Sequence, residues 1–444
     1  MARFKATTTS GVEAIAARAR IAQAKWSSLH PSVRAAALDE AARALQLATS
    51  EFTELGVREV GKPTSEMRDE VARGVATLRY FAQAALDPIG DVLPSDGSTL
   101  LLARTRPVGT VGLVTPWNFP VAIPIWKFAP ALSFGNAALL KPAPEATGVA
   151  LRLVALMNEF LPPDLLAVVP GGADTGRALT GVVDAVSFTG STAVGKTVSV
   201  DAVLLGLPVQ AEMGGLNATI VMPDADLGHA SRLIARAAMG YAGQKCTATS
   251  RVIIVGDPAP FSEAFVLAVQ DLVLGDPSDE KTVVGPVINE AARKSILMSA
   301  RRALESGNRC LTGGSDIDRE GWYVQPTVFD QVSPSDWLAQ NEVFGPVCSI
   351  LEARDDEEAV SIANNVDYGL SGSVFTGDLD RAIAMIEKLH VGLAKVNTTT
   401  TGAEYYAPFG GVSSSSFGPR EQRKAAREFY TWTQTVGVSR TPNS

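Results

Sequence analysis

The sequence has few of the two residue types that most often bind metals or form cross-links. Its 444 residues include three cysteines and three histidines, namely Cys246, Cys310, Cys348, His30, His229 and His390. None of them has the spacing of a CxxC or HxxxH motif, so neither a disulfide framework nor a zinc site is expected. Free cysteines without such a framework are typical of a reducing compartment, and we expect a cytoplasmic protein without a metal.

Long apolar runs and clusters of one charge are also missing. No stretch of about 18 uncharged apolar residues occurs, so we expect no membrane span. Residues 1–20 carry some arginine and little acid, but they lack the apolar core of a secretion signal. The formal net charge is −8 without a block of lysine or arginine, which argues against a nucleic-acid partner.

The remaining composition is that of a globular protein larger than one compact core. With 46% hydrophobic and 19% charged residues, the chain can bury enough apolar surface to fold. A length of 444 residues predicts two or three domains. Apolar residues at helical spacing predict helices over residues 32–60 and 65–86. Glycine and proline divide residues 88–107 into short β-like pieces, which predict a hairpin.

From residue 108 the pattern changes to alternating strands and helices. Apolar, strand-like runs occupy residues 111–114, 137–140, 166–169 and 184–188. Helical stretches lie between these runs, which favours a parallel sheet of the kind that binds nucleotides. A second α/β region extends over about 216–417. Alternation over residues 428–438 predicts an edge strand that pairs with a partner subunit.

The pair with the clearest chemistry is Cys246 in the sequence GQKCT and Glu212 in the sequence EMGG. A thiolate attacks carbonyl carbons, and a nearby carboxylate can activate the water that releases a thioester. The pair therefore points to covalent chemistry on an aldehyde or acyl group. Each residue also has an ordinary alternative, because free cysteines are often small buried residues and a glutamate before two glycines can lie in a surface turn.

Three further polar positions follow predicted strands. Asn118, in TPWNFP, lies between prolines and aromatic residues, so its amide could serve an oxyanion as a fixed donor or could simply belong to a turn. The glycine turn at 188–196 presents free N–H groups to a phosphate at a helix start, although its spacing fits neither GxGxxG nor a P-loop. Lys141 ends a strand, where it faces either the cofactor crevice or solvent.

Taken together, these motifs resemble the aldehyde dehydrogenase superfamily from about Trp26 to Val436. They are PWNFP at 116–120, WK at 126–127, KP at 141–142, FTGST at 188–192, EMGG at 212–215, GQKC at 243–246, EVFGP at 342–346 and PFGG at 408–411. Residues 411–421 resemble the C-terminal signature of a subgroup that includes semialdehyde dehydrogenases. Two departures are a short N-terminal portion and the serine run at 413–416, where glycine or lysine is commoner.

The resemblance implies a mechanism with four catalytic residues. Cys246 forms a thiohemiacetal with the aldehyde, and Asn118 holds the oxyanion together with the Cys246 backbone N–H. Loss of hydride to a nicotinamide leaves a thioester, and Glu212 is the general base for its hydrolysis. Lys127 is implied to influence the proton balance of the thiol and the glutamate. The presence of Glu212 favours water as acceptor and a free carboxylic acid as product.

The cofactor implied by the resemblance is NAD or NADP. The residues implied to bind it are Thr115, Pro116, Trp117, Lys141, Gly190, Ser191, Gly195, Glu342 and Phe344. Family members often have a ribose-binding glutamate three positions after the lysine, whereas this sequence has Pro144 there and Glu145 next to it. Losing that carboxylate removes a repulsion against a 2′-phosphate, so NADP is compatible with the site.

The substrate hypothesis depends on Arg73, which falls where family members place a side chain of the substrate tunnel. An arginine there suits a carboxylate or phosphonate, such as a dicarboxylic semialdehyde or a phosphonoaldehyde, although it could equally be a solvated helix residue. The pocket is expected to be completed by Ile123, Trp126, Thr247, Tyr405 and Tyr406. The tyrosines leave an aromatic aldehyde of the benzaldehyde type as the alternative. A non-catalytic binding protein on the same fold is a third alternative.

The resemblance also implies an architecture of the α/β class. A Rossmann-type NAD(P)-binding domain is expected over residues 1–87 and 108–214, and a catalytic α/β domain over 215–420. A small β flap from 88–107 and 421–444 is expected to cross to a neighbouring subunit. The expected assembly is a homodimer or a homotetramer, with a small-molecule aldehyde as the ligand.

Overall fold

A computed structural model describes residues 4–95, 97 and 99–439. Positions 1–3, 96, 98 and 440–444, which belong to the expected cofactor domain and β flap, lie outside the described residues. Within the described part of the chain, no helix is long and apolar enough to cross a membrane.

Four helices form the N-terminal part of the chain. They are α1 (Thr9–Ser28), α2 (Pro31–Leu47), α3 (Thr49–Val60) and α4 (Thr64–Ala84). Helix α1 was not predicted, since its buried stripe consists mainly of alanines, whose apolar signal is weak. The expected single helix over 32–60 is divided at Ala48, where no glycine or proline marks the break. Gly61, in the left-handed conformation, ends α3.

The first sheet has the predicted parallel core, in the order β17-β7-β6-β3-β4-β5. Its strands are β3 (Thr110–Thr115), β4 (Ala137–Pro142), β5 (Leu166–Val168), β6 (Ala185–Thr189), β7 (Val209–Glu212) and the antiparallel β17 (Ser416–Phe417). The helices of this part are α5 (Ala122–Ser133), η1 (Pro144–Ala146), α6 (Thr147–Met157), α7 (Ala173–Thr180) and α8 (Thr192–Leu204). The strand order reverses between β3 and β6, and ligands bind in such sheets at the carboxyl ends of those strands.

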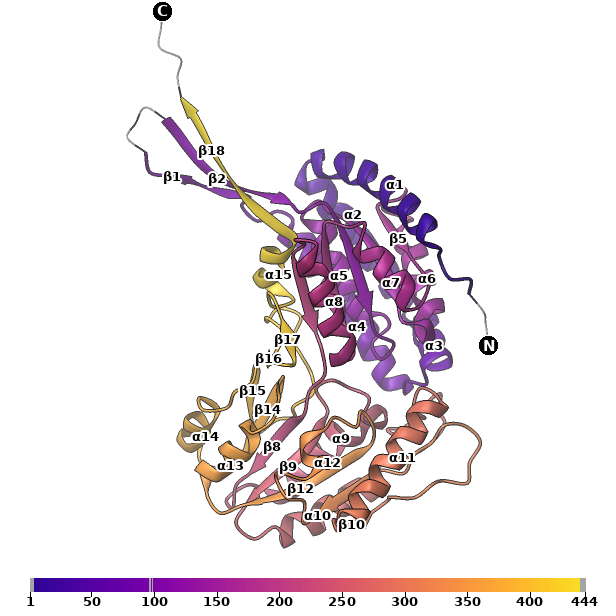
Figure 1. The fold of residues 1–444 in the computed structure, drawn as a ribbon, viewed down its shortest axis with the longest axis vertical. Coiled ribbons are helices and arrows are strands. Elements are labelled where there is room, and N and C mark those ends of the chain that lie inside the picture. The colour runs from indigo at the N-terminus through magenta and orange to yellow at the C-terminus, as the bar shows by residue number, and fades with distance from the viewer. Residues whose placement is uncertain (1–3, 96, 98, 440–444) are drawn as a thin grey trace, which may run out of the picture.

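The second sheet is also largely parallel, in the order β10-β11-β12-β9-β8-β14-β15. Its strands are β8 (Asn217–Val221), β9 (Thr249–Val255), β10 (Arg309–Thr312), β11 (Thr327–Asp330), β12 (Val347–Ala353), β14 (Ser371–Phe375) and β15 (Leu393–Val396). The associated helices are α9 (Leu227–Met239), η2 (Gly240–Gly243), α10 (Ala259–Gln270), α11 (Glu290–Glu305), α12 (Trp337–Gln340), α13 (Asp356–Asn364) and α14 (Leu379–Ile386). Each sheet has its own hydrophobic core, and Figure 1 shows the two bodies one above the other.

A β ribbon extends from the first body (Figure 1). The predicted hairpin consists of β1 (Gly90–Leu93) and β2 (Thr99–Pro107), and β18 (Thr431–Ser439) pairs antiparallel with β2 along its whole length. The predicted edge strand begins later than expected, because residues 428–430 belong to α15 (Arg423–Tyr430). Phe429 and Tyr430 are both buried there, which an alternating strand would not allow.

The C-terminal segment links the two bodies. β17 lies within the range expected for the catalytic domain, yet it pairs with β7 of the first sheet. Just before it, β16 (Val412–Ser413) pairs with β13 (Tyr368–Gly369). A small third cluster of buried apolar residues joins both parts of the chain, and it consists of Ile123, Trp126, Leu370 and Phe409. This cluster forms one wall of the candidate site.

Candidate active site

The loop before Cys246 is held in an unusual backbone conformation. Tyr241, Ala242 and Gly243 all have positive φ, at 54°, 52° and 67°. Left-handed geometry is costly for the first two residues, and such strain concentrates at functional sites. A side chain at Gly243 would place its Cβ 2.2 Å from the Gly345 carbonyl oxygen, so only glycine fits.

Buried amide side chains fix the loop on both sides of the cysteine. Gln244 accepts a hydrogen bond from the Ile288 N–H at 2.9 Å and donates to two backbone carbonyls. Asn217, at the start of β8, donates at 2.8 Å to the carbonyls of Cys246 and Ala248. The sulfur position is therefore determined by the second sheet.

The thiol of Cys246 is protonated at neutral pH in this environment. Burial, followed by the carboxylates of Glu342 and Glu212, raises the pKa of the thiol to about 12. A thiol with so high a pKa attacks slowly, so the site needs a cation or a proton acceptor before it reacts.

Asn118, the predicted oxyanion donor, lies beside this loop. Its Nδ2 donates to the Gln244 carbonyl at 2.9 Å, and the side chain is buried. The Asn118 carbonyl in turn accepts a 3.0 Å hydrogen bond from Lys62 Nζ. Lys62 forms a fully buried ion pair with Glu70 at 2.6 Å, and it lies 3.5 Å from the centre of the Phe119 ring.

The Lys62–Glu70 pair also organises the start of α5. Glu70 Oε1 accepts hydrogen bonds from the backbone N–H groups of Val121 and Ala122, at 2.7 and 2.9 Å. One ion pair thus connects α4, the turn that carries Asn118 and the first turn of α5. Neither residue was among the predicted site residues, since no motif in the sequence marks Lys62 or Glu70.

Glu212 ends β7 and is almost completely buried. Its Oε2 accepts a 2.6 Å hydrogen bond from Ser416 Oγ, whereas Oε1 has no hydrogen-bond partner among the described residues. Burial and the neighbouring Glu421 carboxylate hold the pKa of Glu212 well above its usual range. A raised pKa makes the ionised carboxylate a stronger base than an ordinary glutamate.

Lys127 is buried under the site rather than free within it. Its ammonium forms a short ion pair with Glu421 and donates to Ser187 Oγ at 2.7 Å. It also lowers the pKa of Glu212 electrostatically. Glu421 was not among the predicted site residues, although it lies in the C-terminal signature.

The residues predicted to bind the dinucleotide gather at the carboxyl ends of β3, β4 and β6. Ser191 occupies the N-cap of α8 without a capping hydrogen bond from its side chain, which leaves the first N–H groups of the helix for a phosphate. Gly195 allows close packing, because a Cβ there would lie 2.6 Å from Met213. Gly190 forms the turn between β6 and α8, and its N–H donates to the Glu212 carbonyl.

Polar groups at the carboxyl ends of β3, β4 and β6 fit a bound cofactor. The buried hydroxyls of Thr115 and Thr189, at the ends of β3 and β6, have no hydrogen-bond partner among the described residues. Pro116 and Trp117 follow β3 directly. Lys141, at the end of β4, donates to the carbonyls of Pro142 and Gly171 at 3.0 Å, and burial lowers the pKa of its ammonium.

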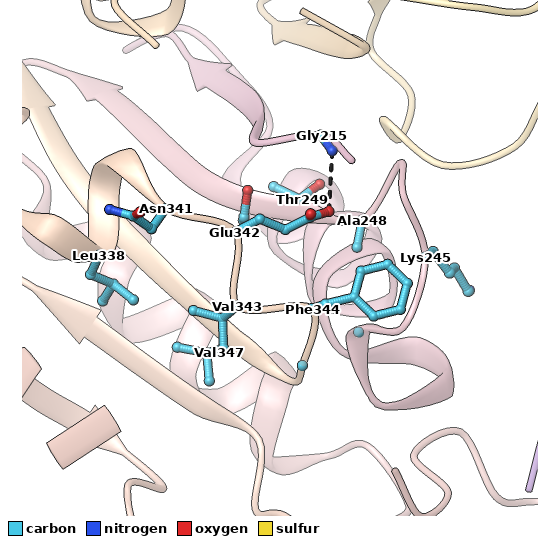
Figure 2. A pocket seen from close by; sticks show the side chains of 13 residues that line it. Gly215, Lys245, Ala248, Thr249, Leu338, Asn341, Glu342, Val343, Phe344 and Val347 are labelled. Atoms are coloured by element: carbon cyan, nitrogen blue, oxygen red, sulfur yellow. Dashed lines mark hydrogen bonds between the residues drawn. The ribbon is translucent and has the colours of Figure 1, made fainter. Parts of the chain in front are cut away.

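Glu342 and Phe344 line a narrow pocket together with Gly215, Lys245 and Thr249 (Figure 2). Glu342 points toward Gly215, whose N–H donates to Oε1 at 3.1 Å. Burial raises the pKa of Glu342 to about 7. The Phe344 ring lies edge-on to Trp117, with the centroids 5.9 Å apart. Glu342 is thus close enough to Cys246 to affect its thiol, and Phe344 contacts the segment that follows β3.

A second cavity, of about 310 Å³, opens above Cys246. The predicted substrate residues Arg73, Ile123, Trp126 and Thr247 line it, together with Phe119, Phe409 and residues 401–403. Arg73 Nη1 donates to the Ala403 carbonyl at 2.6 Å. Phe409 was not predicted as a wall residue, although it lies inside the PFGG motif.

The two tyrosines lie outside this cavity. Tyr405 packs edge-on against Tyr80, with ring centroids 6.1 Å apart, and lines a different cavity beside α4. Tyr406 is 52% exposed. The aromatic wall assigned to them is formed instead by Phe119, Trp126 and Phe409. Sequence proximity to the loop 401–403 does not bring their rings to the sulfur.

Comparison with known proteins gives a single family. The model of the aldehyde dehydrogenase family matches residues 1–436. Alpha-ketoglutaric semialdehyde dehydrogenase of Bacillus subtilis is 39% identical, over 97% of this chain and 91% of its own length. Benzaldehyde dehydrogenase of Pseudomonas putida is 34% identical, over 97% and 89%. The indole-3-acetaldehyde dehydrogenase AldA of P. syringae, a mutant in complex with NAD+ and IAA, superposes with a TM-score of 0.95 and 32% identity, over 99% and 90%.

Replacing Lys62 by methionine should destabilise the protein strongly. The variant leaves the Glu70 charge buried without its partner, which typically costs about 3–5 kcal/mol in the free energy of unfolding. Urea denaturation followed by circular dichroism measures the loss. The double variant K62M/E70Q is the matched control, since the glutamine oxygen can still accept from Val121 and Ala122, and it should recover most of the stability. A loss below about 1 kcal/mol in K62M would show that the pair is not a structural constraint.

Replacing Glu342 by glutamine should make Cys246 more reactive. At pH 8.5 the Glu342 carboxylate is ionised, and its removal lowers the pKa of the thiol. The rate of alkylation by iodoacetamide, followed at the Cys246 peptide by mass spectrometry, should rise by about tenfold per unit of pKa lost. Glu352→Gln, at an exposed position of β12, should leave the rate unchanged. Equal rates in E342Q and the native protein would contradict the electrostatic explanation.

Proposed function

This chain belongs to the aldehyde dehydrogenase family of oxidoreductases, and we propose that it oxidises an anionic aldehyde, in particular a dicarboxylic semialdehyde, to the carboxylic acid with NAD or NADP. The observation that carries this proposal is that Asn118 binds the loop of Cys246 and Glu212 lies close enough to affect its thiol, with Arg73 in the wall of the cavity that Cys246 lines. The name of the Bacillus subtilis relative, which acts on a semialdehyde of this class, supports the substrate.

The proposed reaction begins when the Cys246 thiolate adds to the aldehyde carbon. The alkoxide of the resulting thiohemiacetal accepts hydrogen bonds from the Asn118 amide and the Cys246 backbone N–H. A nicotinamide held at this site would supply the hydride acceptor, and loss of hydride from the thiohemiacetal carbon would leave an acyl group on the Cys246 sulfur as a thioester. Glu212 then takes a proton from the water that attacks the thioester carbon, and the acid leaves as the thiolate is regenerated.

The proposed cofactor site follows the carboxyl edge of the first sheet. Lys141 and the α8 N-terminus, with Gly190, Ser191 and Gly195, would hold the adenosine ribose and the pyrophosphate. Thr115, Pro116 and Trp117 would flank the cofactor, while Glu342 and Phe344 would hold the nicotinamide ribose. Because Pro144 replaces the ribose-binding carboxylate, NADP and NAD are both proposed as acceptors.

The charge of the cavity mouth supports an anionic substrate. The acidic residues there are largely neutralised, since Glu66 pairs with Lys245 at 2.7 Å and Glu70 pairs with Lys62. Asp69 is the remaining carboxylate. Arg73 forms no ion pair among the described residues and uses one N–H for the Ala403 carbonyl. Its other N–H groups are free to bind a carboxylate or phosphonate in a bidentate manner.

An aromatic aldehyde is the second candidate. Phe119, Trp126 and Phe409 line the cavity, with the rings of Trp126 and Phe409 5.2 Å apart. The benzaldehyde dehydrogenase relative supports this alternative. Arg73 favours the anionic substrate, because a neutral aromatic aldehyde would leave its guanidinium without a partner.

We further propose the expected division of the chain and its assembly. The cofactor domain comprises residues 1–87 and 108–214, the catalytic domain 215–420 apart from β17, and the β flap 88–107 and 421–444 apart from α15, which packs in the first core. The exposed apolar side chains of Val92, Leu100 and Val438 on the ribbon support a homodimer or homotetramer in which the flap is covered. The three free cysteines support a cytoplasmic location.

A panel of aldehydes tests the activity. Succinic semialdehyde, phosphonoacetaldehyde, benzaldehyde and betaine aldehyde are each combined with NAD and with NADP, and reduced cofactor is followed by absorbance. We expect the fastest turnover with an anionic aldehyde, and a loss of about a thousandfold or more in Cys246→Ala. Cys310→Ala, far from the cavity, is the matched control and should remain active. No reduction with any aldehyde would favour the non-catalytic binding protein.

The role of Arg73 is tested by Arg73→Gln. Loss of a charged, bidentate contact should raise KM for an anionic aldehyde by about 10- to 100-fold and leave KM for benzaldehyde nearly unchanged. Arg79→Gln, on the same helix but beside a different cavity, is the control and should change neither value. Equal effects of Arg73→Gln on the charged and the neutral aldehyde would refute the anion-binding role.

A further inference from the structure

The serine run at 413–416, an unexplained departure in the sequence, places one hydroxyl directly on the proposed general base. Ser416 lies opposite Glu212 in the antiparallel pairing of β17 with β7. Its Oγ donates to Glu212 Oε2 at 2.6 Å and accepts from the Gly411 N–H at 2.6 Å. A serine hydroxyl has one hydrogen, so the bond from Gly411 directs that hydrogen toward the carboxylate.

The turn before β17 encloses the other side of the same carboxyl group. Gly410 has a φ of 148°, and a Cβ there would lie 2.6 Å from Glu212 Oε1. Any side chain at this position would therefore push Glu212 off Ser416. The Glu212 carboxyl is therefore held in one position by Gly410, Gly411 and Ser416. Its Oε2 accepts the Ser416 hydrogen bond, and its Oε1 has no hydrogen-bond partner among the described residues.

Charged and titratable groups from several elements surround the Glu212 carboxyl. Glu421 raises the pKa of Glu212, whereas Lys127 and Arg420 lower it, and the Cys246 thiol lies close enough to respond to the Glu212 charge. The Ser416 hydrogen bond also lowers the pKa of Glu212. Ser416 is thus the uncharged group in this set that stabilises the carboxylate through direct contact.

We propose that Ser416 is a positioning residue for thioester hydrolysis, which holds Glu212 by Oε2 so that the ionised Oε1 is presented to the attacking water. This inference rests on the proposed function. In the step, the water oxygen bonds to the acyl carbon while Oε1 accepts a water proton. The carbon–sulfur bond then breaks, and its electron pair leaves with the sulfur as the Cys246 thiolate.

Ser416→Ala should affect hydrolysis and spare hydride transfer. Without the hydroxyl, the pKa of Glu212 rises, so the base is protonated up to a higher pH. The acid limb of the kcat profile should move upward by about one pH unit, with about a tenfold loss of kcat at a pH below the native limb. The first-turnover burst of reduced cofactor, measured by stopped flow, should keep its native rate. A merely structural role would instead lower both phases without moving the limb.

Further variants separate the possible outcomes. Ser416→Gly removes the same hydroxyl and must shift the limb equally, even if the alanine variant folds poorly, whereas Ser416→Thr keeps a hydroxyl and should restore the native limb. Ser414→Ala, in the same run and without a side-chain hydrogen bond in the described part of the chain, is the control. A profile of Ser416→Ala or Ser416→Gly that superimposes on the native one overturns the inference. Absence of cofactor reduction by the native protein with every aldehyde overturns the proposed function itself.

Discussion

Three buried carboxyl groups lie around a single thiol, and the rest of the site depends on how their charge is held. Burial raises the pKa values of Glu212 and Glu342, and both carboxylates add to the burial that raises the pKa of Cys246. The third, Glu421, is held by Lys127 in an ion pair beneath them. The resting site therefore keeps its thiol protonated. A cation that enters beside the sulfur favours the thiolate, and the oxidised nicotinamide is such a cation.

The three buried carboxyl groups can lie this close together because each has its own hydrogen-bond or ion-pair partner from a different part of the chain. Glu342 accepts a hydrogen bond from the Gly215 N–H, and Glu212 accepts one from the Ser416 hydroxyl. Glu421 forms an ion pair with Lys127. A buried carboxyl without such a partner would be costly. The partners come from the strand-connecting loop, the C-terminal segment and α5, so the site forms only when both sheets are assembled.

Much of the site could be predicted from the sequence because its motifs are local. The segments around Asn118 and Glu212 follow or end parallel strands, which bring such positions to one edge of a sheet, and the segment of Cys246 is a short motif between η2 and β9. Contacts between distant segments carry no such signal. The pairing of Lys62 with Glu70 and that of Ser416 with Glu212 depend on side-chain directions that periodicity does not encode. The same reason explains why Tyr405 and Tyr406 were assigned to a wall they do not form. The helix α1 was missed because alanine is both a helix former and a weak core signal.

The double glycine after Glu212 shows how the two sheets come to share one reaction centre. β7 ends at Glu212 and β8 begins at Asn217, so only four residues connect the base to the amide that fixes the cysteine loop. A Cβ at Gly214 would lie 2.2 Å from Glu342 Oε2, and one at Gly215 would lie 2.6 Å from the Cys246 carbonyl. Any side chain at either position would separate the thiol from the carboxyl groups that set its pKa. The short glycine connection therefore determines the distance between nucleophile and base as directly as the two residues themselves.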